Sequence, residues 1–94
     1  MLDTRRPRRT PGYLVGPVPS SNADFVLADP TGRCTLRVNP SVGLIWGLCD
    51  GHRAPREIVR LLLDAYPERA DNMDSDVRET LIALTEYGAI EWVP

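Results

Sequence analysis

The feature that most constrains this chain is a change in hydrophobic period near its middle. Residues 33–38 alternate between polar and apolar side chains, which predicts a strand with one buried face. Asn39 and Pro40 follow directly as a good N-cap and a good first helical residue, and apolar residues then recur at helical spacing until Asp50 and Gly51. The chain must therefore combine a sheet with helices in one small fold.

The residues on either side of this switch complete the predicted element order. Residues 13–15 and 24–28 are candidate strands, and the turn sequence Asp-Pro-Thr-Gly at residues 29–32 leads into the strand at 33–38. The fold class we predict is α+β: a winged helix-turn-helix-like domain in which a three-stranded antiparallel sheet is followed by three helices. The helices are expected at residues 40–49, 55–66 and about 73–87, with a polar loop at 68–72 and a short final strand at 89–93.

The 94 residues suffice for one domain. Residues 1–11 carry four arginines and two prolines, so we expect a disordered basic tail there, whose removal leaves folding intact, and a single domain over residues 12–94. The sequence contains neither an apolar run long enough to cross a bilayer nor an export signal. We therefore expect a cytoplasmic protein with no membrane partner, in which the two cysteines are free thiols.

The sequence contains few of the residue patterns that are typical of catalytic sites. His52 is the single histidine and is expected in an exposed turn, and one histidine with two cysteines does not make a metal site. The glycines are scattered and form no phosphate-binding loop. We therefore predict no catalytic activity, no metal and no cofactor. Binding of nucleic acid is also not expected, because the third helix carries four acids against Arg78 and would repel phosphate.

Packing expectations follow from the helical pattern. Gly43 and Gly47 each cost about 1 kcal/mol in a helix relative to alanine, which predicts close contact with another element at both positions. The third helix should turn Val77, Leu81 and Leu84 toward the core, with the two leucines near Ile45 and Trp46 of the first helix.

Over roughly residues 12–93 the chain resembles the PqqD family. The resemblance is carried by a strand end, an Asn, an apolar helix and a closing Asp-Gly at residues 38–51, by the pattern of the second helix, and by the third helix and its exit. The residues outside the first segment are Glu57, Ile58, Leu61, Leu62, Asp76, Val77, Leu81, Leu84, Gly88 and Ile90. The departures from the family pattern are Pro40, Ala54 and Thr80, and they concern the detailed shape of a groove.

The resemblance implies a RiPP recognition element, which binds the leader of a ribosomally made precursor peptide and delivers it to a modifying enzyme such as a radical SAM enzyme, a leader peptidase or a cyclase. It also implies that the leader is added as a strand beside the third strand and against the third helix. An edge strand is a template for such addition. The residues we expect to bind peptide are Arg33, Cys34, Thr35, Leu36, Arg37 and Val38 on the strand and Asp76, Thr80, Ala83 and Tyr87 on one flank of the helix.

Three alternatives stay open at the level of sequence. Arg33 and Arg37 either pair with acids of a leader or are solvated charges that protect an edge. The chain as a whole could be a winged-helix interaction or regulatory domain, associated with nucleic acid through its arginine-rich arm. A piece of a larger enzyme is the weakest alternative, given a start at Met1 and a compact ending at Pro94.

Overall fold

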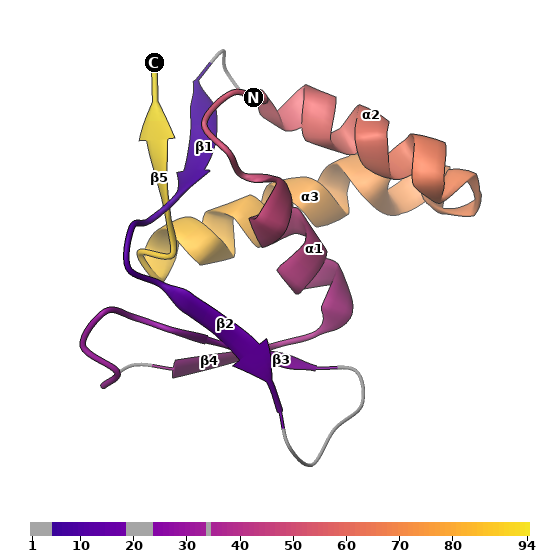
Figure 1. Cartoon of the computed structure of the whole chain (residues 1–94). Helices are drawn as coiled ribbons and strands as arrows, with labels where there is room; N and C mark the ends of the chain where they lie inside the picture. Colours follow the sequence, from indigo (N-terminus) through magenta and orange to yellow (C-terminus); the bar gives the residue numbers. More distant parts are fainter. Residues whose placement is uncertain (1–4, 19–23, 34) are drawn as a thin grey trace.

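The chain builds a three-stranded antiparallel sheet, three helices and a two-stranded ribbon, as seen in a computed structural model that describes residues 5–18, 24–33 and 35–94 (Figure 1). The predicted sheet and helices are confirmed, and the ribbon is additional. The elements are β1 (Arg6–Arg9), β2 (Leu14–Pro17), β3 (Phe25–Ala28), β4 (Thr35–Val38), α1 (Pro40–Leu48), α2 (Pro55–Ala65), the short 3-10 helix η1 (Pro67–Arg69), α3 (Ala70–Glu86) and β5 (Ile90–Val93).

The three-stranded sheet has the order β2-β3-β4, so β4 lies at one edge. Both pairings are antiparallel, and Leu27 of β3 stands opposite Leu36 of β4. Along β4, Leu36 is half-buried and Val38 is buried, whereas Thr35 and Arg37 are exposed. This alternation confirms the predicted half-buried strand for the residues that the structure describes.

Helix α1 begins as its sequence predicts. The Asn39 side chain accepts a hydrogen bond from the Val42 amide at 2.9 Å, with Pro40 in the first turn. Of the two glycines, only Gly43 makes the close approach that was predicted: a Cβ there would lie 3.2 Å from the Phe25 ring. The expectation for Gly47 was wrong, because a Cβ there would meet nothing within 4 Å.

Helices α2 and α3 lie side by side and are joined by η1. At the start of α2, Ala54 cannot cap with its side chain, but the Glu57 carboxylate accepts a hydrogen bond from its amide at 2.9 Å. Helix α3 starts at Ala70, earlier than predicted, and η1 occupies part of the expected loop. Ala70, Asp71 and Asn72 are exposed and include no large hydrophobic side chain, so they carry no hydrophobic period that would reveal a helix.

The expected disorder over residues 1–11 does not hold for residues 6–9, which form β1 and pair with β5. The Pro7 side chain is fully buried. The Arg9 amide donates to the Cys49 carbonyl at 3.0 Å, and the Gly51 amide donates to the Pro7 carbonyl at 2.8 Å. Backbone pairing and one buried proline hold this segment, so low hydrophobicity did not mean disorder.

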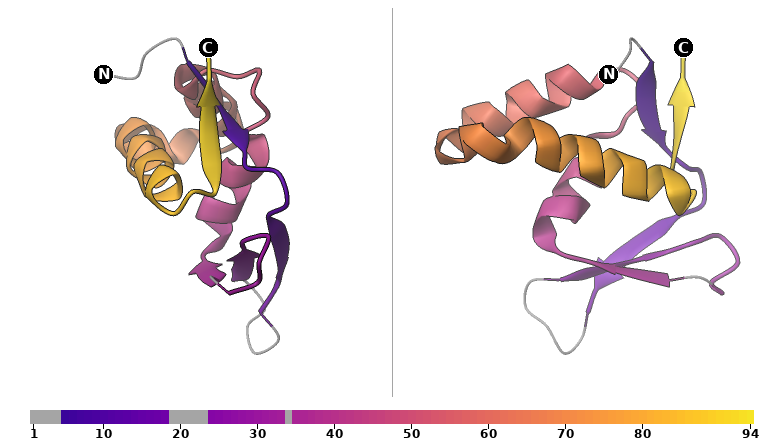
Figure 2. Two further views of the ribbon diagram at one scale, coloured as in Figure 1. Left: turned by 90° about the vertical axis from the view of Figure 1, so that its left-hand side faces the viewer. Right: turned by 180° about the vertical axis from the view of Figure 1, so that it is seen from behind.

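One hydrophobic core joins β3, β4, the three helices and β5. It runs from Leu27 in the sheet through Ile45 and Trp46 of α1 to residues of α2, α3 and β5. Leu81 and Leu84 belong to it, which confirms the predicted packing of α3 against α1. Figure 2 shows the resulting layers, with α1 between the sheet and the pair formed by α2 and α3. Among the described residues, no helix combines the length and apolar character needed to cross a membrane.

Candidate functional site

A groove of about 510 Å³ runs between the edge strand β4 and helix α3. Seven of the ten residues that were predicted from the sequence to bind peptide line this groove. The strand and the helix run in opposite directions, so the end of β4 faces the start of α3. The seven residues are Leu36, Arg37 and Val38 from β4 and Asp76, Thr80, Ala83 and Tyr87 from α3.

Helical spacing explains why α3 presents this flank. Val77, Leu81 and Leu84 are buried in the core and fix the rotation of the helix. The groove flank lies beside that buried stripe, so Thr80 is half-buried and Ala83 is exposed. The flank is therefore small and uncharged at its centre, which suits contact with apolar side chains.

The open edge of β4 is the second wall of the groove. Among the described residues, β4 pairs with β3 alone, so its outer amides and carbonyls are placed to pair with another extended chain. Strand addition uses these main-chain groups for affinity and the neighbouring side chains for selectivity. The geometry can therefore accept a peptide with one side against α3.

The far end of α3 is tied to the segment before β2. The Tyr13 hydroxyl donates a hydrogen bond to the Tyr87 carbonyl at 3.0 Å, and Gly88 ends the helix at a φ of +77°. A small hollow between Tyr13, Tyr87 and Leu36 marks this end of the groove. The separation of α3 and the sheet is thus held by contacts that do not involve the groove's own centre.

Charges of both signs border the groove. Arg37 Nε lies 2.9 Å from an Asp24 carboxylate oxygen, and Arg69 lies 3.3 Å from an Asp76 oxygen. Both pairs are partly exposed, so each contributes about 0–1 kcal/mol. The side chains of such weak ion pairs can bind a charged ligand instead of each other at little cost in free energy.

Three of the residues singled out do not join the groove. Arg33 is exposed before β4, and Thr35 points to the small hollow beside Tyr87. Cys34 lies outside the described residues. Whether the other seven bind peptide stays a prediction.

Seven further residues line the groove without having been predicted to bind peptide, and two of them, Ile45 and Leu84, were expected in the core. Asn39, Ser41 and Val42 join it because α1 turns back beside β4, and Arg69 arrives from η1. Whether these residues reach the groove depends on the angles at which the helices pack, and no local sequence pattern encodes those angles. Glu79 of α3 also lines the groove, although it was not among the residues predicted to bind peptide.

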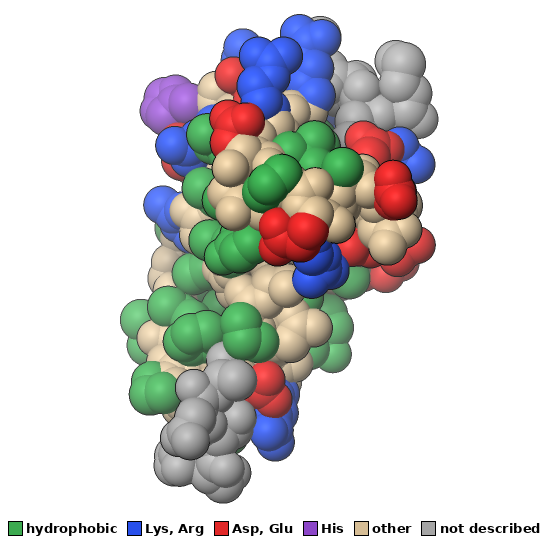
Figure 3. All heavy atoms as spheres, turned by 90° about the vertical axis from the view of Figure 1, so that its right-hand side faces the viewer, with side chains coloured by type: hydrophobic (Ala, Val, Ile, Leu, Met, Phe, Trp, Pro, Cys, Tyr) green, Lys and Arg blue, Asp and Glu red, His purple; other side chains and the backbone are tan. Residues whose placement is uncertain are grey.

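A second apolar surface lies toward the opposite edge of the sheet, around β2. Its large exposed hydrophobic side chains are Val15, Phe25 and Leu44. A shallow hollow there is floored in part by Gly43. Figure 3 shows hydrophobic side chains gathered in the lower half of the view. This surface and the groove use different edges of the sheet.

In the part of the chain that the structure describes, the side chains that commonly bind metal ions are not gathered in one place. The described residues contain no group of three or more His, Cys, Asp and Glu side chains that could hold a metal ion. Cys49 is buried, and burial raises the pKa of its thiol to about 12. His52 is exposed in the turn, as predicted, and its amide donates to Asp50. That hydrogen bond is the main cause that lowers the pKa of the Asp50 carboxyl.

Comparisons with known proteins agree with this geometry. The profile of a family described as coenzyme PQQ synthesis protein D (PqqD) matches residues 24–90. Among solved structures, TbiB1 in complex with the TbiA(beta) leader peptide is similar in fold, with a TM-score of 0.69 and 21% sequence identity over 89% of this chain and 94% of that one. A comparison with curated proteins gave no significant match.

Proposed function

Because this chain belongs to the PqqD family, we propose that it binds the leader of a ribosomally synthesised precursor peptide and presents the precursor to a modifying enzyme. The observation that carries the proposal is the open edge of β4, which faces a flank of α3 that is small and uncharged at its centre, across one groove. The leader is added to β4 as a strand, and its apolar side chains rest on Thr80, Ala83 and Tyr87.

In this proposal the chain itself is an adaptor without catalytic activity. The modifying enzyme, of the radical SAM, peptidase or cyclase class, supplies the chemistry. The similar fold of TbiB1, which was solved with a leader peptide, supports the same use of the fold here.

The arginines of the N-terminal segment support this function over binding of nucleic acid. Arg8 forms an ion pair with Glu91, and the Arg9 guanidinium lies over the Trp46 ring at 5.7 Å. The Arg5 guanidinium lies over the Trp92 ring. These side chains are engaged with the fold, and the acidic α3 would repel phosphate.

The test is a calorimetric titration with the synthetic leader of the precursor peptide encoded beside this gene. Thr80→Glu or Ala83→Glu forces a charge against apolar leader groups, so we expect affinity to fall about tenfold to a hundredfold. The matched control is Ile82→Glu, since Ile82 is exposed on the same helix but does not line the groove. Native circular dichroism is required of all three variants. Wild-type affinity in both groove variants would show that the leader binds elsewhere.

A further inference from the structure

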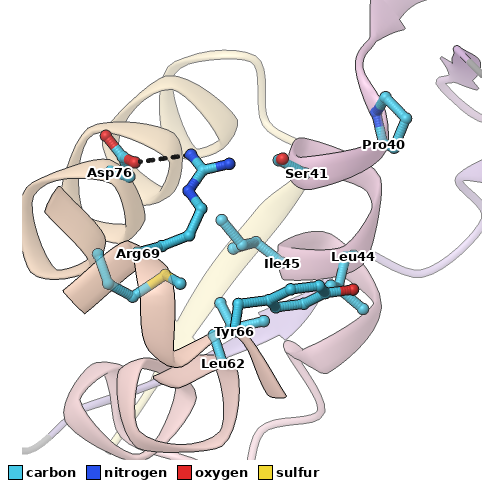
Figure 4. Close-up of a pocket in the computed structure, with 9 residues that line it drawn as sticks. Pro40, Ser41, Leu44, Ile45, Leu62, Tyr66, Arg69 and Asp76 are labelled. Atoms are coloured by element: carbon cyan, nitrogen blue, oxygen red, sulfur yellow. Dashed lines mark hydrogen bonds and ion pairs between the residues drawn. The ribbon is translucent and has the colours of Figure 1, made fainter. Parts of the chain in front are cut away.

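The groove does not stop where β4 ends. A separate pocket of about 190 Å³ lies beyond that point, between α1, the end of α2 and the start of α3 (Figure 4). The two hollows share four lining residues. These are Ser41, Ile45, Arg69 and Asp76. A chain that follows β4 to its end is therefore led directly to the mouth of the pocket.

The pocket is apolar below and partly open above. Ile45, Leu62 and Met73 are buried members of the core and form its floor. Leu44 and Tyr66 are exposed and form one wall, where Figure 4 shows the Tyr66 ring beside Leu44. An apolar ligand would cover hydrophobic surface that is otherwise left to water.

A polar rim faces this apolar wall. Figure 4 shows Arg69 reaching across to Asp76, with Ile45 between this pair and the Leu44 wall. The ion pair closes the pocket on the side of the groove, and its two side chains are about half exposed. A peptide that leaves the groove must pass this pair to place a side chain inside.

The size of the pocket limits its occupant. An apolar protein cavity of about 150 Å³ holds a benzene ring. A pocket of about 190 Å³ thus accepts one aromatic or branched aliphatic side chain and no more. Interfaces commonly depend on one such anchor in a desolvated pocket.

We propose that this pocket is the specificity site of the protein and takes one large apolar side chain of the leader, from the segment just beyond the residues paired with β4. The inference rests on the proposed function, because the leader must first lie in the groove. It adds a sequence requirement: a bound leader needs an aromatic or branched aliphatic residue just beyond its strand-forming segment.

The experiment starts from a displayed library of random 15-residue peptides, from which binders of the wild-type protein are selected. One selected peptide and its alanine-scan variants are then titrated by fluorescence anisotropy against wild type and Leu44→Glu. Leu44 lines the pocket but not the groove, and it is 41% exposed. The matched control is Leu61→Glu on α2, since Leu61 is 42% exposed and lines neither hollow.

We expect one large apolar peptide residue whose replacement by alanine weakens binding to wild type and to Leu61→Glu about tenfold or more. The same replacement should change binding to Leu44→Glu by about twofold or less, because the carboxylate has already removed the favourable site. Tyr66→Ala, which removes the other side chain of the same wall, should reduce the same coupling and serves as a second variant if Leu44→Glu folds poorly.

Two results would contradict the proposals, and they are distinguishable. If Thr80→Glu abolishes binding but every alanine replacement weakens Leu44→Glu, Tyr66→Ala and wild type equally, the groove is right and the pocket inference is wrong. If Thr80→Glu binds the selected peptides as wild type does, the leader does not lie in the groove and the proposed function fails at its site.

Discussion

Trp46 connects more parts of the molecule than any motif in the sequence suggests. Its indole N–H donates a hydrogen bond to the Ala89 carbonyl at 3.0 Å in the core. Its ring receives the Arg9 guanidinium, which also donates to the Gly47 carbonyl. One side chain of α1 thus fixes both the start of β5 and the end of β1. The sequence alone did not indicate this role, because an aromatic residue at helical spacing is equally consistent with a side chain that only fills the core.

We expect Trp46→Phe to lower the free energy of unfolding by about 1–2 kcal/mol, because the Ala89 carbonyl keeps the Thr10 amide but loses its second hydrogen bond, and the smaller ring leaves a gap in the core. Urea denaturation measures this. Trp92→Phe is the control: its indole donates to the hydroxyl of Thr85, which is exposed, so water can replace it and the loss should stay below about 1 kcal/mol. Equal losses in the two variants would contradict the role of Trp46.

Cys49 gives a prediction for alkaline pH. Burial raises the pKa of its thiol to about 12, whereas the unfolded chain ionises near the ordinary value of about 8.5. The thiol's contribution to stability is therefore complete below about pH 8.5 and is lost as pH rises toward 12. In a Cys34→Ser background, adding Cys49→Ala should flatten the decline in stability between pH 8.5 and 10.5. Parallel declines with and without Cys49 would show that its thiol is accessible in the folded state.

Among the elements, β1 is the one that the sequence concealed. The ribbon of β1 and β5 adds a four-residue antiparallel ladder, an Arg8–Glu91 ion pair and a backbone bridge to Asp50. The basic segment therefore closes the end of the core where α1 turns toward α2.

Deleting residues 1–10 should lower the free energy of unfolding by about 2–4 kcal/mol, because several backbone hydrogen bonds and the burial of Pro7 are lost. Deletion of residues 1–4 is the control, since it leaves β1 and its pairing with β5 in place. Chemical denaturation of the two truncated proteins and the full chain makes the comparison. A full-length stability after removal of residues 1–10 would show that the ribbon contributes nothing.

Elements with local signals were predictable, and those held by distant partners were not. Asn39 and Pro40 fix the start of α1 through their own side chains, so the sequence located it correctly. In contrast, β1 has arginines and a proline whose partners lie over 80 residues away, and its pairing leaves no local pattern. The start of α3 was missed because its first three residues are exposed and none is a large hydrophobic residue.

At the scale of the whole molecule, the parts of the site that depend on local sequence signals were likewise predictable, and the parts that depend on distant partners were not. The periods of β4 and α3 locate both elements and the flank of α3 beside its buried stripe, and seven of the ten residues predicted from them meet in the groove. The contributions of Ser41 and Arg69 depend on the angles at which α1 and η1 meet α3, which no period encodes. The pocket beyond β4 is for the same reason a property of the assembled fold.

The single core predicts cooperative unfolding. It runs without a break from Leu27 in β3 to Ile90 in β5, so the sheet and the ribbon share one set of buried residues. Thermal unfolding followed by tryptophan fluorescence and by far-ultraviolet circular dichroism should give coincident curves. Separate transitions for the two signals would indicate that the sheet and the helices form independent units.

The four-residue length of β4 sets how long a complex can last. At about 3.3 Å per residue the paired segment spans only about 13 Å, so an added strand makes a few hydrogen bonds of about 0.5–1.5 kcal/mol each. Backbone pairing alone then supports no better than micromolar affinity and rapid dissociation. A short residence time lets one copy of this protein serve many precursor molecules in succession, with the choice among them made by side chains and not by the strand.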